Sequence, residues 1–451
     1  MIVGRAVDPV ELKGALTHLW QLSEVKLLKL SERHQETEPP PVHTVAGQYV
    51  PRPWTDWTRG FHHGSLLLQF EATGDQRFFD LGRVRTLGEM GEHLTDFAVH
   101  DHGFNIVSTY GNLWRLAHRD GMPESHFELR LYEQALRVSG AVQAKRWSAL
   151  GEEGGYIYSF NGPHSLFVDS IRTLRSLALG HLLGQSLRDE AGRAISLVER
   201  LRHHLLSTAR YNVFYGESRD IYDIRGRVAH EALFNSEDGS FRAPSTQQGY
   251  SPFSTWSRGL AWAVLGFAEQ VEFLRHIGAD GDEASHRALQ AATATADYYI
   301  EGASAADGVP YWDTAAPGLS EIGDWKTLPA DPFNPYEPVD SSAAAIAAQG
   351  LLRLGCYLGE RRYVDAGLKL ADVLFRTPYL SESPDHEGLL LHGIYHRPRG
   401  WDYIPPGHTV PCGEATMWGD YHARELALCV GALAKGERLP TFFSPRAGPT
   451  P

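Results

Sequence analysis

The segments GDQRFFDLG (74–82) and GERRYVDAG (359–367) share one pattern of glycine, acidic, arginine, aromatic, aspartate and glycine positions in register. In each, a glycine suited to the C-terminus of a helix precedes an acidic residue suited to the first turn of the next helix. Repeated helical hairpins are therefore expected, and at roughly 70 residues per hairpin six of them fill the chain. We predict an all-α (α/α)6 toroid. An open helical solenoid is the alternative that periodicity leaves open.

Apolar residues recur at three- and four-residue spacing in about twelve segments, the number that six hairpins require. Short β-hairpins in loops are expected at 307–313 and 388–396. Because no linker rich in Pro or Ser divides the chain, we expect one toroidal domain over 1–438 and a flexible tail over 439–451. The helical segments are 10–30, 65–72, 77–94, 104–117, 126–146, 166–183, 191–206, 255–275, 284–300, 342–357, 361–375 and 415–434.

The composition is that of a globular protein, with 42% hydrophobic and 22% charged residues among 451. A net charge of −13 argues against a nucleic-acid partner, and no apolar run is long enough to span a membrane. The N-terminus does not read as a signal peptide. Three cysteines without CxxC spacing favour a cytoplasmic protein with no disulfide and no zinc site. If the ligand is an anion, a few local Arg and His side chains must bind it.

The segment TQQGYSPFSTWSRGLAWAVLGF (246–267) predicts a helix from Thr255, with Ser254 as its N-cap. Trp256 belongs to one apolar stripe of this helix, while Arg258 and Trp262 lie on a second face at i and i+4. That second face suits an inner helix that lines a pocket. The alternative is that Trp262 is a core residue and Arg258 pairs with a buried carboxylate.

Two further segments place aspartates near helix starts. In VHDHGF (99–104), His100 and Asp101 come just before a helix, where an anion is favoured; a simple Asp N-cap is the alternative, and two His at i and i+2 are a weak metal signal. Asp169 is flanked by apolar residues, so it is either a buried structural acid or a carboxyl with a raised pKa. The two aspartates are about one hairpin apart and can converge on one cavity, as the carboxyl pair of a glycosidase does. His230 by itself reads as a structural histidine.

The order of seven motifs resembles glycoside hydrolase family 88, the unsaturated glucuronyl hydrolases, and more distantly family 105, the unsaturated rhamnogalacturonyl hydrolases. The motifs run through most of the chain, and none of the usual signatures for acyl transfer, nucleotide binding or zinc hydrolysis is present. They are WTRGFHHG (57–64), HDHGF (100–104), QGYSPFSTWSRGLAW (248–262), PYWDTAAP (310–317), VDSSAAAIAAQGLL (339–352), LLLHGIYHRP (389–398) and WGDYHARE (418–425).

This resemblance implies an enzyme that removes a 4,5-unsaturated uronic acid from the non-reducing end of lyase-generated oligosaccharides. It assigns Asp169 as the general acid and base and Asp101 as a second essential aspartate. No metal or organic cofactor is implied. Burial and the neighbouring carboxyl are expected to raise the pKa of Asp169. The residues expected to bind the uronate ring are His100, His230, Gln247, Gln248, Arg258 and Trp262.

The chain departs from the family pattern in two places. Gln247 stands where the family has His, and the segment SIRTLR (170–175) stands where the family has Met and Asn. Arg172 and Arg175 either lower the pKa of Asp169, bind extra negative charge such as sulfate, or pair with acids on an adjacent helix. The alternative functions are hydrolysis of a saturated uronide or other glycoside and non-catalytic sugar binding.

Overall fold

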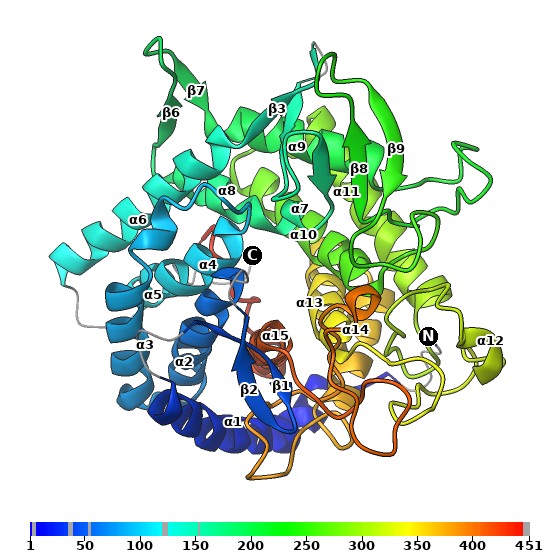
Figure 1. The fold of residues 1–451 in the computed structure, drawn as a ribbon. Coiled ribbons are helices and arrows are strands. Elements are labelled where there is room, and N and C mark those ends of the chain that lie inside the picture. Colours follow the sequence, from blue (N-terminus) through cyan, green and yellow to red (C-terminus); the bar gives the residue numbers. More distant parts are fainter. Residues whose placement is uncertain (2–5, 35–38, 53–55, 120–124, 152–153, 445–451) are drawn as a thin grey trace.

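The computed structural model describes residue 1 and residues 6–34, 39–52, 56–119, 125–151 and 154–444. Its helices alternate along the chain between an outer and an inner layer (Figure 1). The outer helices are α1 (Lys13–Arg33), α3 (Gln76–Glu89), α6 (His126–Lys145), α9 (Leu197–Tyr211), α11 (Glu283–Tyr298) and α14 (Arg361–Leu374). The inner helices are α2 (Arg59–Thr73), α4 (His102–Ile106) continued by η4 (Val107–Gly111) and α5 (Asn112–Ala117), α7 (Ser170–Thr173) continued by α8 (Arg175–Leu182), α10 (Ser257–His276), α13 (Ser341–Leu358) and α15 (Met417–Ala434).

The inner layer closes on itself. Contacts run from α2 to α4, then to α7, α10, α13 and α15, and from α15 back to α2. A solenoid leaves its first and last repeats apart, so this closed ring confirms the (α/α)6 toroid. One hydrophobic cluster contains residues from Leu12 to Phe443.

The sequence explains which helices form the inner layer. Helix α13 is buried on all sides from Ser341 to Gly355 because most of its residues are small or aliphatic. Its Gly350 lies against the backbone of α10, where a Cβ atom would come within 2.7 Å of the Leu265 backbone. Helix α14, by contrast, buries one stripe and exposes the other, as an outer helix does. The repeated segments behave as expected, since Gly74 and Gly359 both end helices in the left-handed conformation.

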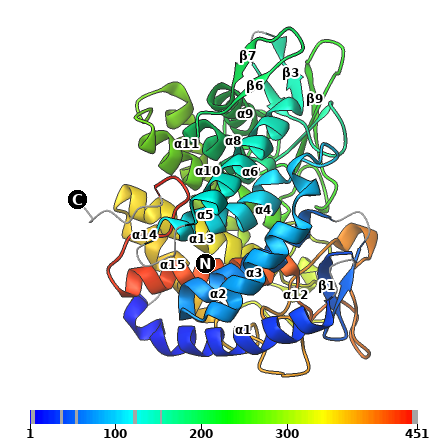
Figure 2. The same ribbon diagram turned by 90° about the vertical axis from the view of Figure 1, so that its left-hand side faces the viewer.

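The strands are short and lie in loops, as predicted, but not where predicted. The sheets are β1 (Pro41–Val45) with β2 (Gln48–Pro51), β3 (Trp147–Ala149) with β4 (Gly155–Ile157), β6 (Ser186–Arg188) with β7 (Ala194–Ser196), and β5 (Ser165–Phe167) with β8 (Glu231–Phe234) and β9 (Phe241–Ser245). All pair antiparallel, and several project beyond the helices (Figure 2). The predicted hairpins at 307–313 and 388–396 are wrong. Both segments make only isolated bridges, because their partners are distant residues such as Val339 and Ala415.

Two other details correct or extend the predictions. The predicted tail begins too early, since Phe442 and Phe443 are buried and pack against the ring; 445–451 lie outside the described residues. Helix α10 begins at Ser257, and the hydroxyl of Ser254 instead bonds to the carbonyl of Ser251. The remaining short elements are η1 (Pro9–Leu12), η2 (Asp56–Thr58), η3 (Glu92–Leu94), η6 (Tyr299–Ala303), α12 (Leu319–Ile322) and η7 (Arg397–Arg399). None of the described helices is long and apolar enough to cross a membrane.

Candidate active site

The candidate site lies where the inner helices begin. Outer and inner helices alternate from α1 to α15, so the inner helices run in the same direction and their N-termini meet at one end of the ring. Asp101 directly precedes α4, Asp169 precedes α7, Arg258 is in the first turn of α10 and Asp340 caps α13. The positive ends of the long helices α10 and α13 favour negative charge here.

Asp101 and Asp169 form a buried carboxyl pair with His100 between them. The Nε2 atom of His100 lies 3.5 Å from Oδ1 of Asp169 and 3.7 Å from Oδ1 of Asp101. All three residues are less than a tenth exposed. Neither aspartate makes a side-chain hydrogen bond that caps its helix, so the simple N-cap interpretation of Asp101 is wrong. The structure thus confirms that residues one hairpin apart converge.

The two carboxyls have pKa values shifted in opposite directions. Burial raises the pKa of Asp101 to about 6, and the charge of Asp169 adds to this rise. Burial also acts on Asp169, but the hydrogen bond and charge of His100, with the charge of His230, outweigh it and lower the pKa of Asp169. The expectation of a raised pKa for Asp169 in the free protein is therefore wrong. Burial lowers the pKa of His100, yet Asp101 and Asp169 outweigh burial and raise it.

His230 supplies a hydrogen-bond donor with no partner among the described residues. Its Nδ1 atom accepts the backbone N–H groups of Gln247 (3.0 Å) and Gln248 (3.3 Å), so its proton is assigned to Nε2. Nε2 is buried and has no hydrogen-bond partner among the described residues. Burial lowers the pKa of His230 to about 4, so the ring is neutral near pH 7. Phe167 and Trp256 hold the ring, with centroids 4.4 and 4.8 Å away.

The two glutamines are held by neighbouring side chains. Gln247 Nε2 donates to Glu231 (3.1 Å), a fully buried acid that also accepts from Asn161 and Ser165. Gln248 Oε1 accepts from Arg258 (3.0 Å). Gln247 therefore anchors the loop after β9 to strand β8, and this loop in turn fixes His230.

Arg258 and Trp262 are structural in this arrangement. Arg258 donates to Asp340 (2.7 Å), to Gln248 and to the carbonyls of Ile394 and Tyr395, and it is 2% exposed. Trp262 is also 2% exposed and lies in the core among Phe104, His422 and Arg172. The interpretation of Trp262 as core and Arg258 as the partner of a buried carboxylate is the one that the structure shows. A pocket-facing ring or guanidinium is not seen.

Phe160 is a residue of the site that sequence reasoning missed. Its ring is 48% exposed and lies parallel to His100, with centroids 6.3 Å apart and an angle of 16°. Phe160 stands in the loop between β4 and β5, outside any helical periodicity. Its one signal in the sequence is an aromatic residue just before an Asn-Gly turn.

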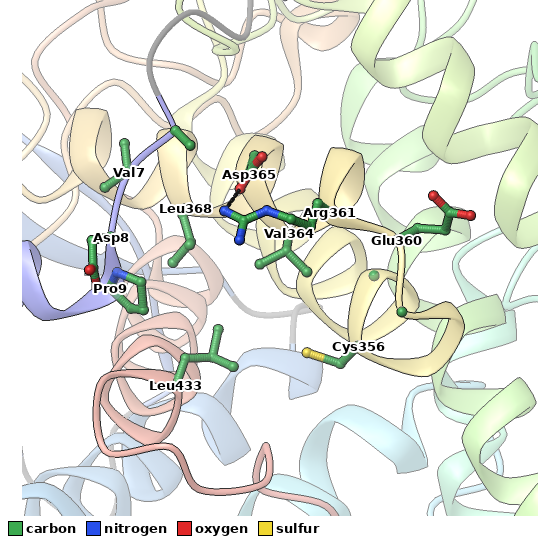
Figure 3. Close-up of a pocket in the computed structure, with 13 residues that line it drawn as sticks. Val7, Asp8, Pro9, Cys356, Glu360, Arg361, Val364, Asp365, Leu368 and Leu433 are labelled. Carbon is green, nitrogen blue, oxygen red and sulfur yellow. Dashed lines mark hydrogen bonds and ion pairs between the residues drawn. The ribbon is translucent and has the colours of Figure 1, made fainter.

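The described residues contain no group of three His, Cys, Asp or Glu side chains that could hold a metal ion. Two cavities lie at the other end of the ring, near the C-termini of the inner helices. One, of about 490 Å³, lies between the N-terminal segment around Asp8 and the α13–α14 turn at Cys356 and Arg361 (Figure 3). The other, of about 700 Å³, contains Glu71 and Arg115. Neither is lined by any of the predicted site residues.

Comparison with known proteins shows which proteins this chain is similar to. The chain is 29% identical over 405 residues to an unsaturated glucuronyl hydrolase from Bacillus sp. (strain GL1), covering 86% of this chain and 90% of that protein. The chain is a homologue of the unsaturated glucuronyl hydrolases. An unsaturated chondroitin disaccharide hydrolase from Streptococcus pyogenes serotype M1 is 24% identical over 90% of this chain and 88% of its own length. No protein-family model matches the chain.

Solved structures of unsaturated glucuronyl hydrolases share the fold. That of the Bacillus sp. GL1 enzyme, described as responsible for the degradation of glycosaminoglycan, superposes with a TM-score of 0.68 at 24% identity, over 91% of this chain and 96% of that one. One described as specific for heparin gives 0.72 at 19% identity, over 95% and 100%. The resemblance to glycoside hydrolase family 88 is therefore confirmed, and this unsaturated glucuronyl hydrolase homologue is an enzyme of the glycoside hydrolase class.

Proposed function

We propose that the enzyme releases a 4,5-unsaturated uronic acid from the non-reducing end of oligosaccharides. The observation that carries this is the buried pair of Asp101 and Asp169 on either side of His100, at the end of the toroid where the inner helices begin. Protonating a carbon atom requires a positioned acid in a site shielded from water, and this pair supplies it. The homologues named for unsaturated glucuronyl and chondroitin substrates support the same reaction.

The reaction proposed is hydration of the C4=C5 enol ether. Asp169 gives a proton to C4, and the positive charge that forms at C5 is shared with the ring oxygen. Water then adds at C5 and returns its proton to the Asp169 carboxylate. The hemiketal at C5 opens to a ketone, the ring oxygen stays on C1 as a hydroxyl, and C1 becomes an aldehyde as the bond to the leaving sugar breaks. The overall reaction consumes one water molecule and releases the unsaturated uronic acid as an open-chain keto-aldehyde.

His100 and Asp101 solve the problem that Asp169 is ionised in the free site. The two carboxyls raise the pKa of His100, whose Nε2 lies 3.5 Å from Asp169, and Asp101 has a pKa of about 6. When an anionic uronate enters the same buried site, its charge raises the pKa of Asp169 and the proton moves toward that carboxyl. The three groups therefore act as one titrating unit.

The groups that can bind the uronate are those with hydrogen-bond donors not used within the described part of the protein. His230 offers its Nε2–H, and the Nε2 of Gln248 makes no hydrogen bond to a described residue. Phe160 offers a ring face beside His100 for the sugar. We propose these three as the direct contacts, with Arg258 and Gln247 holding Gln248 and His230 in place.

The test is a spectroscopic assay. The protein is incubated with disaccharides from heparin, chondroitin and other polysaccharide lyases, and the ultraviolet absorbance of the C4=C5 bond is followed. We expect that absorbance to fall, and Asp169→Asn to stop its fall. Turnover of saturated glycosides alone, or binding of the unsaturated sugars with no turnover, would contradict the proposal.

We also propose that the enzyme acts in the cytoplasm on imported oligosaccharides. Its three cysteines, Cys356, Cys412 and Cys429, are all free, as is usual in a reducing compartment. Fractionation of the source cells, followed by the same assay on each fraction, tests this.

A further inference from the structure

A buried cluster of charged side chains lies on the ring axis, one helical turn below Asp169. Arg172 is its centre and is fully buried. Its Nε and Nη2 atoms donate to the two oxygens of Glu269 on α10, at 3.0 and 3.2 Å, and Nη2 also donates to Glu425 on α15, at 3.0 Å. Its Nη1 donates to His422 on α15. These contacts join α7 to an adjacent inner helix and to the inner helix across the ring.

The cluster is electrically balanced. Arg172 and Arg175 face Glu269 and Glu425, and the Nη1 of Arg175 lies 3.7 and 3.9 Å from these two acids. His422 donates from Nδ1 to the carbonyl of Trp418, so its Nε2 is the acceptor and the ring is neutral. Of the interpretations of Arg172 and Arg175, pairing with acids on other helices is the one that the structure shows. Arg172 is occupied by these contacts. Arg175 donates from Nη2 to the carbonyl of Gly103, and its Nε and Nη1 have no hydrogen-bond partner among the described residues.

Stability alone does not account for such a cluster. Removing two ion pairs from water costs about as much as their attraction returns, and apolar side chains of similar volume often stabilise a core as well. What charged, directional contacts add is a single arrangement of the helices they join. The element of the active site that this arrangement holds in place is α7.

Helix α7 carries Asp169 at its start. It has four residues, Ser170–Thr173, and Asp169 directly precedes it. On one side of Asp169, the N–H of Val168 donates to the carbonyl of His230 (2.9 Å). On the other side, the N–H of Arg172 donates to the carbonyl of Asp169 itself (3.0 Å). Only Leu174 separates α7 from α8, which continues the chain, and within the turn that follows Asp169 the side chain of Arg172 adds direct contacts to α10 and α15.

We propose that Arg172 is a positioning residue for Asp169, acting through its ion pairs with Glu269 and Glu425 to hold the first turn of α7 so that the carboxyl of Asp169 faces His100 and the sugar ring. The inference rests on the proposed function. It predicts that losing Arg172 slows proton transfer more than it weakens substrate binding, since a small displacement of an acid from C4 affects the rate of the chemical step.

The experiment compares Arg172→Met with Arg353→Met. Arg353 is also a buried arginine, and it pairs with Glu272 on α10 (2.9 Å), but it lies twelve residues into α13, roughly 18 Å along the helix from the active-site end. We expect both variants to lose similar thermal stability. Only Arg172→Met should lose kcat, by at least about 10-fold with KM changed less than about 2-fold, and Arg172→Lys should recover part of the rate.

A second readout does not need turnover. The His100 imidazole titrates under the influence of Asp169, so its pKa, followed by NMR with ¹⁵N-labelled histidine and a His100→Gln assignment control, should fall in Arg172→Met and stay unchanged in Arg353→Met. If Arg172→Met does not fold, Glu425→Gln removes one partner and leaves Glu269 in place. Equal kcat losses in the two arginine variants, or an unmoved His100 titration, would overturn the positioning role. A wild-type enzyme inactive on every unsaturated uronide overturns the proposed function instead.

Discussion

Two buried groups of charges lie along the ring axis, and they differ in how completely their hydrogen bonds are made. In the upper group, the contacts of His100 to the two carboxyls are 3.5 and 3.7 Å long, and Nε2 of His230 has no partner among the described residues. In the lower group, Arg172 makes its contacts with the acids at 3.0 to 3.2 Å. The upper group consists of aspartates and histidines, whereas the lower group pairs two arginines with two glutamates beside His422; both groups are buried.

The difference indicates where a ligand belongs. A buried polar atom without a partner is costly, so it persists where a ligand completes its hydrogen bonds. The lower group offers a ligand little, because its acids and Arg172 already bind one another. The two nitrogens of Arg175 that lack a hydrogen bond to a described residue still carry a charge balanced by the same two acids, 3.7 and 3.9 Å from Nη1. Arg258 lies beside the upper group, but its terminal nitrogens already donate to four acceptors. Like Arg172, it therefore has little left to offer a ligand.

The largest effect expected is on the rate. Asp169→Asn removes the proposed proton donor and should lower kcat by about 10²- to 10⁴-fold, the usual contribution of a general acid. The matched control is Asp307→Asn. Asp307 is a partly buried aspartate of raised pKa outside the site, so this variant should keep its activity. Initial rates on an unsaturated disaccharide measure both. Comparable losses of kcat in the two variants would contradict the role of Asp169 as the proton donor.

Arg258 gives the next largest effect, and it falls on folding. Arg258→Met leaves Asp340 buried without its partner, so the free energy of unfolding should fall by about 3–5 kcal/mol. Urea denaturation measures this. The double variant Arg258→Met/Asp340→Leu should regain part of the loss. An Arg258→Met protein of unchanged stability but greatly raised KM would show instead that Arg258 binds the uronate.

The two aspartates should affect stability in opposite directions. The pKa of Asp101 rises from 3.8 to about 6 on folding, so its ionisation costs stability as pH rises through that window, by roughly 3 kcal/mol at pH 7. Asp101→Asn should therefore be stabilising at pH 7 relative to wild type and nearly neutral at pH 4. The pKa of Asp169 is lowered, so Asp169 adds stability above its unfolded pKa, and Asp169→Asn should be destabilising at pH 7. Denaturation at both pH values checks this; shifts of the same sign would contradict it.

Phe160 should affect binding modestly. If its exposed ring stacks on the sugar, Phe160→Ala loses about 0.5–1.5 kcal/mol, which is roughly a 2- to 12-fold rise in KM with kcat little changed. Phe253→Ala is the control, because that ring is also about half exposed. An equal response of the two variants would exclude a specific contact by Phe160.

The smallest effect concerns Gln247. Gln247→His can keep the hydrogen bond to Glu231 and add positive charge near the site. A several-fold lower KM for an ordinary unsaturated glucuronide, with kcat unchanged, would show that this position sets specificity. An unchanged KM would leave Gln247 with its anchoring role alone.

The fold was readable from the sequence because its signal is local and repeated. Gly74 and Gly359 mark equivalent helix ends, and apolar periodicity marks most helices. The convergence of Asp101 and Asp169 also followed from the hairpin spacing. The direction of the pKa shift of Asp169 could not be predicted, because it depends on the orientation of the His100 side chain. The spacing of apolar residues carries no information about that orientation. The predicted binding roles of Arg258 and Trp262 were wrong for a similar reason. Their helix was correctly predicted to be an inner one, but Asp340, Ile394 and Tyr395 occupy the hydrogen-bonding positions around Arg258.

The closure of the ring has a consequence for synthesis of the chain. Helix α15 packs between α13 and α2, and α1 lies against both α2 and α15. During translation, the surfaces of α1 and α2 that pack against α15 therefore stay exposed until α15, the last inner helix, leaves the ribosome. The nascent chain has to be protected for nearly its whole length. Stop codons or cleavage anywhere before Met417 should yield aggregation-prone fragments rather than smaller, stable proteins.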